Sequence, residues 1–450
     1  MPADPAALSR TLATAILGLD TLWGGDVTSP SGTGRFIADS WFSDEPLPEA
    51  HRHPAAARLR QAGGVGAEAP DLAAVDAYLS AVDVPGAIAD LAAAGAARRD
   101  LRGAYLEGLA GSLQVMWELV RERTGRGPAV PYERCVRASI GAAPGPSRPE
   151  ERRRRVAELL AAAGYPSSAP DGLLAAVDAW RRDRIVAPRS IPLLAGALVA
   201  QLDALALRHV VPHLPPALRE IPRANVRFLS IADAWFSGSM NYLGRARRPD
   251  GTPEYEATYE VNASLQISAP ELVDLVAHEV VPGHVTTFAL LQALHAGGAL
   301  GFEATVLTMN TRGAALSEGI ANAALLLAHG VTAVEELPDP DLQLGMLLAL
   351  LQDDAKNQAS WLTWGEGAPQ DEVAAVLRRE FLCSEERAAK LSGSWGRHPL
   401  NGRMYLPCYR AGTEKLLALL RRHPAAELVP ALYGARGLVD VVTIDRVLPQ

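Results

Sequence analysis

Cysteine and lysine are two residue types of which this sequence has very little. The three cysteines, at positions 135, 383 and 408, are scattered along 450 residues. An odd number without metal-type spacing argues against a disulfide framework and indicates a reducing compartment. Lysine occurs only at positions 356, 390 and 415, so arginine supplies most of the 43 basic residues.

Positive charge is also in deficit, because 51 acidic residues outnumber the 43 basic ones and leave a formal net charge of −8. Phosphate neutralisation is the main source of general nucleic-acid affinity, so we expect no nucleic-acid partner. The N-terminus lacks a basic start followed by a sustained apolar region and a cleavage site. Charges interrupt the runs rich in Ala and Leu, so we expect no membrane-spanning segment and no membrane partner. These absences together predict a soluble, cytoplasmic protein.

Hydrophobic residues, by contrast, make up 48% of the chain, which is ample for a large buried core. Apolar residues recur at helical spacing through most of the sequence and predict a mainly α fold. We expect one long helix or two in succession over 85–124, and further helices over 171–184 and 191–209. The stretch 141–151, rich in Pro, Gly and Ser, separates an N-terminal helical region, 1–140, from a helical catalytic region, 150–450. One continuous domain over 1–450 is the alternative.

A small β element is expected just before the helix that carries the most informative motif. Residues 225–262 are richer in Gly, Ser and aromatics, and residues 255–262 alternate as a strand does. This segment is a candidate edge strand that could pair with an extended substrate.

The motif helix begins at a capping box, since Ser268 is followed three residues later by Glu271. Its apolar face ends in Glu279, whose burial would need a compensating partner such as a metal-activated water. His278 stands beside Glu279, and His284 follows six residues later. In a regular helix these histidines would lie about 240° and about 9 Å apart, too far to share one ion.

Pro282 and Gly283 lie between the two histidines and can break the helix, which would bring His284 back toward His278. Two histidines are insufficient for a zinc site, so we expect a third ligand from a later element. Glu318 is the first choice, because its helical neighbours are small and would let its helix pack closely. Glu303 is the competing ligand. Zinc is expected, one ion per chain, with manganese, cobalt and iron left open.

The order His-Glu-x-x-Pro-Gly-His at 278–284, followed by Glu-Gly-x-Ala at 318–321, resembles the domain-of-unknown-function 885 family. Members of that family are predominantly helical and are regarded as zinc metallopeptidase-like. The resemblance continues more weakly at Asp353 with Trp361 and at 409–412, so it covers roughly the second half of the chain. Val285 and Asn357 replace histidines that the family often has, and substrate preference is therefore not transferred.

The resemblance implies metal-assisted hydrolysis of an amide or peptide bond in a small peptide-like substrate. Glu279 is expected to act as general base, passing a proton from water to the leaving nitrogen. Tyr409 is the first candidate donor to the developing oxyanion, with Arg403 and His398 behind it. Two alternatives stay open: a tailoring hydrolase for a non-peptide amide or ester metabolite, and a non-catalytic helical binding protein with a structural metal site.

Overall fold

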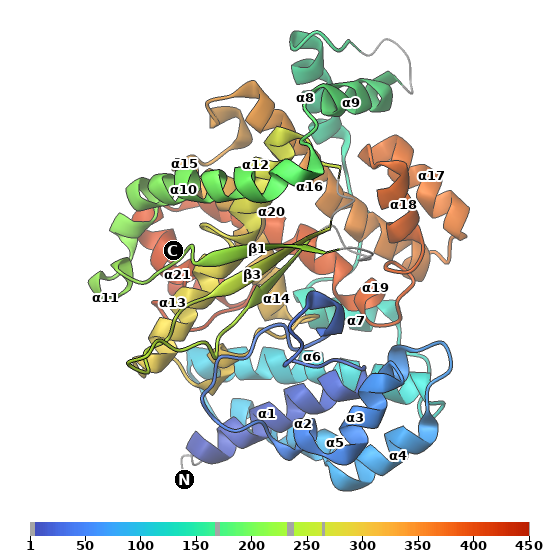
Figure 1. Ribbon diagram of the computed structural model, residues 1–450. Coiled ribbons are helices and arrows are strands. Elements are labelled where there is room, and N and C mark those ends of the chain that lie inside the picture. The colour runs from blue at the N-terminus through green and yellow to red at the C-terminus, as the bar shows by residue number, and fades with distance from the viewer. Residues whose placement is uncertain (1–4, 167–171, 232–237, 263–265, 450) are drawn as a thin grey trace.

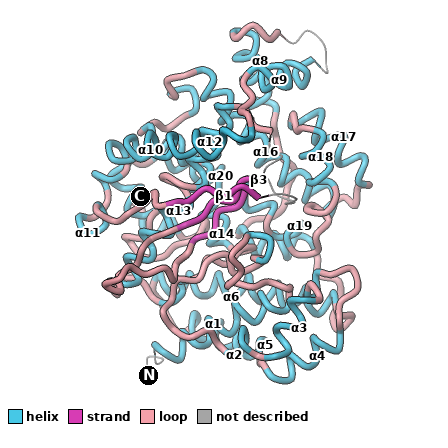
Figure 2. The backbone as a smooth tube through the Cα atoms, viewed as in Figure 1, coloured by secondary structure: helices cyan, strands magenta, loops and turns pink. Residues whose placement is uncertain are grey.

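The computed structural model describes residues 5–166, 172–231, 238–262 and 266–449 of the chain. Helices account for 63% of the protein, and a single small sheet of three strands lies among them in the described part (Figures 1 and 2). The predicted mainly α fold with a minor β element is therefore confirmed.

The N-terminal part is a layer of helices at the bottom of Figure 1, drawn in blue and cyan. The predicted helical stretch over 85–124 is two helices, because the chain breaks before Asp100, which caps the second one by accepting from the Gly103 amide at 2.8 Å. The helices are α1 (Pro5–Leu22), α2 (Glu49–Arg52), α3 (Pro54–Gln61), α4 (Leu72–Ala81), α5 (Val84–Ala96), α6 (Leu101–Arg123) and α7 (Tyr132–Ile140).

Helices resume at residue 150, after a connection over 141–149 that contains none, as its Pro and Gly content predicts. The remaining helices are α8 (Glu150–Ala162), α9 (Gly172–Asp183), α10 (Ile191–His209), α11 (Pro216–Arg219), α12 (Ala269–Glu279), α13 (His284–Ala296), α14 (Arg312–Asn322), α15 (Ala324–His329), α16 (Pro340–Ser360), α17 (Gln370–Phe381), α18 (Glu385–Ser392), α19 (Asn401–Met404), α20 (Leu406–Arg422) and α21 (Ala425–Leu432).

The sheet has the order β1 (Val226–Ile231), β3 (Ala257–Asn262), β2 (Gly238–Tyr242). β3 pairs in parallel with β1 on one side and antiparallel with β2 on the other, and all six of its residues are buried. The expectation that 255–262 is an edge strand is wrong, because neighbouring strands take the backbone hydrogen bonds on both of its sides. This strand has no free edge to offer a substrate.

Helix α10 corrects a second expectation. The stretch Pro188–His213 is long and apolar enough to cross a membrane by length and composition, with mean hydropathy 1.7 and 28% of the tested window buried. Between residues 191 and 209 only Asp203 and Arg208 are charged, which is too few to interrupt the apolar run as expected. Its outer face leaves the Leu193 side chain 79% exposed.

Helices α14 and α20 approach each other through their backbones. A Cβ on Gly319 would lie 2.4 Å from the carbonyl oxygen of Gly412, and a Cβ on Gly412 would lie 1.9 Å from the carbonyl oxygen of Ala315. Any larger residue would force the two helices apart. This close contact fixes Glu318, next to Gly319, relative to Thr413, next to Gly412, and to Tyr409, three residues before Gly412.

Candidate metal centre

The predicted break in the helix after Glu279 is present. α12 ends at Glu279 and α13 begins at His284, with a cis Val281–Pro282 peptide between them. A Cβ on Gly283 would lie 1.8 Å from the carbonyl oxygen of His278, so only glycine fits this turn. The break brings the rings of His278 and His284 to a centroid separation of 4.9 Å, nearly perpendicular at 88°.

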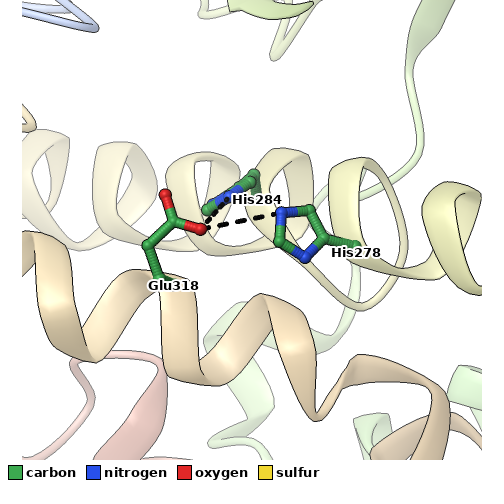
Figure 3. Close-up of side chains that lie close together, drawn as sticks. All are labelled: His278, His284 and Glu318. Atoms are coloured by element: carbon green, nitrogen blue, oxygen red, sulfur yellow. Dashed lines mark ion pairs between the residues drawn. The ribbon is translucent and has the colours of Figure 1, made fainter. Parts of the chain in front are cut away.

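Glu318, on α14, completes a group of three possible ligands. Its Oε2 atom lies 3.7 Å from His278 Nε2 and 3.9 Å from His284 Nε2 (Figure 3). One ligand atom from each of the three residues lies within 4.8 Å of the other two. Among the described His, Cys, Asp and Glu side chains, these three therefore form a group that could hold a metal ion. Ligands about 2.1 Å from a tetrahedral zinc ion lie about 3.4 Å apart, so the three atoms need little movement to share one ion.

The carboxylate of Glu318 shows that a positive partner fits between these side chains. Its Oε1 atom accepts a hydrogen bond of 2.5 Å from the Tyr405 hydroxyl. Its Oε2 atom is buried and has no hydrogen-bond partner among the described residues. An unsatisfied buried acceptor costs about 1–3 kcal/mol, and more if it is charged. Because this oxygen faces two imidazole nitrogens, the residues present fit a divalent cation.

Electrostatics at the site agree with this assignment. Burial lowers the pKa of His278 well below its ordinary value and that of His284 to about 4, so both rings are neutral at pH 7 and can donate a lone pair. Burial raises the pKa of Glu318 to about 7. Burial and then the charge of Glu318 raise the pKa of Glu279 to about 8. A cation among them would relieve this crowding of carboxylates.

Glu303, the competing ligand, is engaged elsewhere. It lies in the short helix Phe302–Thr305 and is 3% exposed. Arg102 holds both of its oxygens, at 2.6 and 2.8 Å, in a bidentate ion pair. Glu303 is not among the three clustered side chains, so Glu318 is the better candidate for the third ligand.

Tyr409 lies one residue removed from the candidate ligands, because it packs against Tyr405, which hydrogen-bonds Glu318. The Lys356 ammonium sits 3.2 Å from the centroid of its ring, and the Tyr405 ring packs edge-on against it at 5.2 Å. Burial, followed by the charge of Glu318, raises the pKa of Tyr409 well above its ordinary value. Its hydroxyl therefore stays protonated and can donate a hydrogen bond. Its role as the oxyanion donor stays a prediction.

Arg403 and His398 have other partners. Arg403 pairs with Glu122 at 2.8 Å and lies over the Trp364 ring. His398 accepts hydrogen bonds from the backbone amides of Leu400 and Asn401, each at 3.2 Å, just before the short helix α19. Both side chains hold local structure together, and neither is brought to the three candidate ligands.

Three contributors were missed in the sequence. Tyr405 hydrogen-bonds Glu318, and the Ser317 hydroxyl lies 3.4 Å from His284 Nδ1. The charge of Asp39, from the N-terminal part, acts on both His284 and Glu279. Tyr405 lies one helical turn before Tyr409, which was a usable signal. Nothing local marks Asp39, which lies 245 positions before His284 in the chain.

Comparison with known proteins adds fold similarity without a family. No family model matches the chain, and no curated protein matches it. A solved structure described as a "putative lipoprotein from Colwellia psychrerythraea" aligns with a TM-score of 0.51 and 15% identity over 80% of this chain, which spans 65% of that protein's length. A "putative lipoprotein of unknown function from Shewanella oneidensis" aligns with a TM-score of 0.51 and 14% identity, over 90% of this chain and 79% of that one. At these identities the similarity concerns the fold alone.

Proposed function

We propose that this protein is a divalent-metal-dependent hydrolase, with zinc as the expected ion, that cleaves an amide or peptide bond in a small peptide-like substrate. One observation carries the proposal: single ligand atoms of His278, His284 and Glu318 converge within 4.8 Å. Glu279 follows directly after His278 in the chain, and the charge of Glu318 adds to burial in raising its pKa. Three protein ligands leave a coordination position open, as catalytic sites do and closed structural sites do not.

The expected ion, when bound, would polarise a substrate carbonyl and bring the pKa of water to about 7. His278 and His284, neutral at pH 7, would hold it together with Glu318. Glu279 takes a proton from the attacking water and delivers it to the leaving nitrogen. Its pKa of about 8 belongs to the metal-free protein, and a neighbouring cation lowers it toward the ionised form that a base requires. Tyr409 is the candidate donor to the oxyanion.

Burial of the ligands favours a small or extended substrate. The side chains of His278, His284 and Glu318 are only 17%, 10% and 6% exposed. A scissile bond must come close to these largely buried side chains, which is easier for a short peptide or peptide-like metabolite than for the surface of a folded protein. Non-peptide amides and esters meet the same steric requirement and belong in the same screen.

Metal content and turnover test the proposal together. We expect about one zinc per chain in the purified protein, and its loss from a still-folded His278→Ala/His284→Ala variant. We expect Glu279→Gln to keep the metal and to lose turnover on a peptide and amide library by about a thousandfold or more. A wild-type protein that takes up no zinc when zinc is supplied would refute the metal site. A zinc protein that Glu279→Gln leaves equally active would refute the mechanism.

A further inference from the structure

A chain of polar side chains runs away from His278 through the core. The Asn322 side chain makes a hydrogen-bonding contact with His278. Asn322 Nδ2 donates to Thr413 Oγ1 at 2.8 Å, and Thr413 Oγ1 donates to Asp353 Oδ2 at 3.1 Å. Asp353 Oδ1 accepts from the Lys356 ammonium, also at 3.1 Å. The chain crosses four helices, α12, α14, α20 and α16.

The hydrogen bond between Thr413 and Asp353 sets the direction of the other hydrogen bonds between Asp353 and His278. An ionised carboxylate can only accept hydrogen bonds, so the Thr413 hydroxyl must donate its single proton to the hydrogen bond with Asp353. Thr413 then offers Asn322 only a lone pair, which the amide must meet with its NH₂ group. The amide oxygen of Asn322 is thereby turned to the other side, where it can accept a proton from a histidine ring nitrogen.

This direction matters for the candidate ligand. The Nε2 atom of His278 faces Glu318, so that nitrogen needs a free lone pair to bind an ion. The ring proton must then sit on Nδ1, and an acceptor there fixes both the tautomer and the ring orientation. A reversed Asn322 amide would present NH₂ to His278 and favour the wrong tautomer.

We propose that Thr413 and Asp353 are positioning residues, which act through Asn322 to hold His278 in the tautomer and orientation that bind a divalent metal. The inference rests on the proposed metal site. In the described part of the chain, neither residue is hydrogen-bonded or ion-paired with the three candidate ligands, so both act through Asn322. The Lys356 ammonium is the charge partner of Asp353, whose carboxylate is only 4% exposed.

The close packing of α14 on α20 builds this chain. Asn322 lies three residues after Gly319, and Thr413 lies next to Gly412, the two glycines through which the helix backbones meet. Thr413 is 2% exposed and Lys356 is 7% exposed, so water does not compete for these hydrogen bonds. A buried chain of this kind has one low-energy arrangement, as orientation of a ligand requires.

The test compares zinc affinity in four proteins: wild type, Thr413→Val, Thr413→Ser and Asp353→Asn. Valine keeps the shape of threonine and removes the hydroxyl, whereas serine keeps the hydroxyl. Asparagine at 353 keeps the shape and can donate to Thr413, which permits reversal of the chain. The dissociation constant for zinc is measured by chelator competition, the cobalt(II) absorption spectrum reports the ligand geometry, and thermal unfolding of each metal-free variant controls for folding.

We expect Thr413→Val and Asp353→Asn to weaken zinc binding by about 10- to 100-fold and to change the cobalt spectrum, and Thr413→Ser to restore both toward wild type. If Thr413→Val does not fold, Asp353→Asn against wild type makes the same comparison. Wild-type affinity in both variants, or equal loss in Thr413→Ser and Thr413→Val, would overturn this inference while leaving the metal site intact. A wild-type protein that binds no zinc would overturn both proposals together.

Discussion

Tyr405 donates a hydrogen bond of 2.5 Å to Oε1 of Glu318, while Oε2 of the same carboxylate faces the two histidines without a hydrogen-bond partner among the described residues. The two oxygens therefore have different tasks. One anchors the side chain and the other is left free to bind an ion. Tyr405 is 9% exposed, so water does not compete strongly for this bond.

Replacing Tyr405 by phenylalanine should therefore weaken metal binding without removing a ligand. Loss of the hydroxyl leaves Oε1 of Glu318 without its anchor, and we expect zinc affinity to fall by about 10-fold. Chelator competition measures the change. Tyr78→Phe is a matched control, because the Tyr78 hydroxyl is also buried and donates to the Ala50 carbonyl, in the N-terminal part. Equal zinc affinity in Tyr405→Phe and wild type would remove the anchoring role.

The identity of the third ligand can be tested by neutralising each candidate glutamate. We expect Glu318→Gln to lose most of its zinc, because a neutral amide oxygen is a poor substitute for a carboxylate. We expect Glu303→Gln to keep zinc at about the wild-type stoichiometry and to lose stability instead, since its partner Arg102 loses an ion pair. Elemental analysis and thermal unfolding of the two variants give both results. The reverse pattern of zinc content would make Glu303 the ligand.

The contact between α14 and α20 should tolerate no side chain at its glycines. Gly412→Ala places a methyl group 1.9 Å from the Ala315 carbonyl, and we expect a loss of about 1–3 kcal/mol in the free energy of unfolding, measured by denaturant titration. Gly111→Ala is the control: this helical position is exposed and has no neighbouring atom within 4 Å. There we expect a gain of up to about 1 kcal/mol from helix propensity. A Gly412→Ala variant as stable as wild type would contradict the close contact.

Local chemistry made much of the candidate site predictable. Ser268 accepts a hydrogen bond from the Glu271 amide at 3.4 Å, so the predicted helix start is correct. The helix break at Pro282 and Gly283 was predictable because it follows from the backbone preferences of proline and glycine alone. The helix boundaries of α10 were predicted in the same way. Pattern alone could also place Glu318 on a helix of small residues able to pack closely.

Long-range pairing is what the sequence did not reveal. Alternation correctly indicates a strand near residues 255–262, but only its pairing with β1, from Val226 opposite Ala257 onward, makes β3 central and not an edge strand. The charge of Asp39 reaches His284 across a gap of 245 positions, which no local pattern records. Exposure of α10 likewise depends on what packs around the helix, and hydropathy cannot supply that information. The failures at β3 and Asp39 concern which segments lie side by side, whereas the failed expectation for α10 concerns composition, because only two charged residues lie within its apolar run.

The raised pKa of Glu279 predicts how the metal-free protein responds to pH. Its pKa is about 8 in the folded state against an ordinary value of 4.5, mainly because of burial. Between these values the folded protein keeps a proton that the unfolded chain has released, so the free energy of unfolding falls as pH rises. This contribution is fully present below about pH 4.5 and is lost as pH passes through about 8. In the presence of a chelator, we expect wild type to have a lower Tm near pH 9 than near pH 6.

The Glu279→Gln variant isolates that contribution, because glutamine does not titrate. Glu318 shifts in the same direction and stays in both proteins, so the fall in Tm should shrink in the variant without vanishing. Scanning calorimetry at the two pH values measures it. An equal fall in both proteins would mean that Glu279 is ionised in the folded, metal-free state and that its burial is relieved by another contact.

Tyr409 and Tyr405 lie one helical turn apart, yet replacing them by phenylalanine should have different effects. Tyr405 is bonded to a candidate ligand, whereas Tyr409 packs against the Lys356 ammonium and keeps a protonated hydroxyl. If Tyr409 donates to the oxyanion, Tyr409→Phe should bind zinc like wild type and lose about 100-fold in kcat, with KM little changed. The substrate is whichever peptide or amide the library screen identifies. A Tyr409→Phe variant with full turnover would remove the residue from the mechanism, and one with weakened zinc binding would make it a positioning residue like Tyr405.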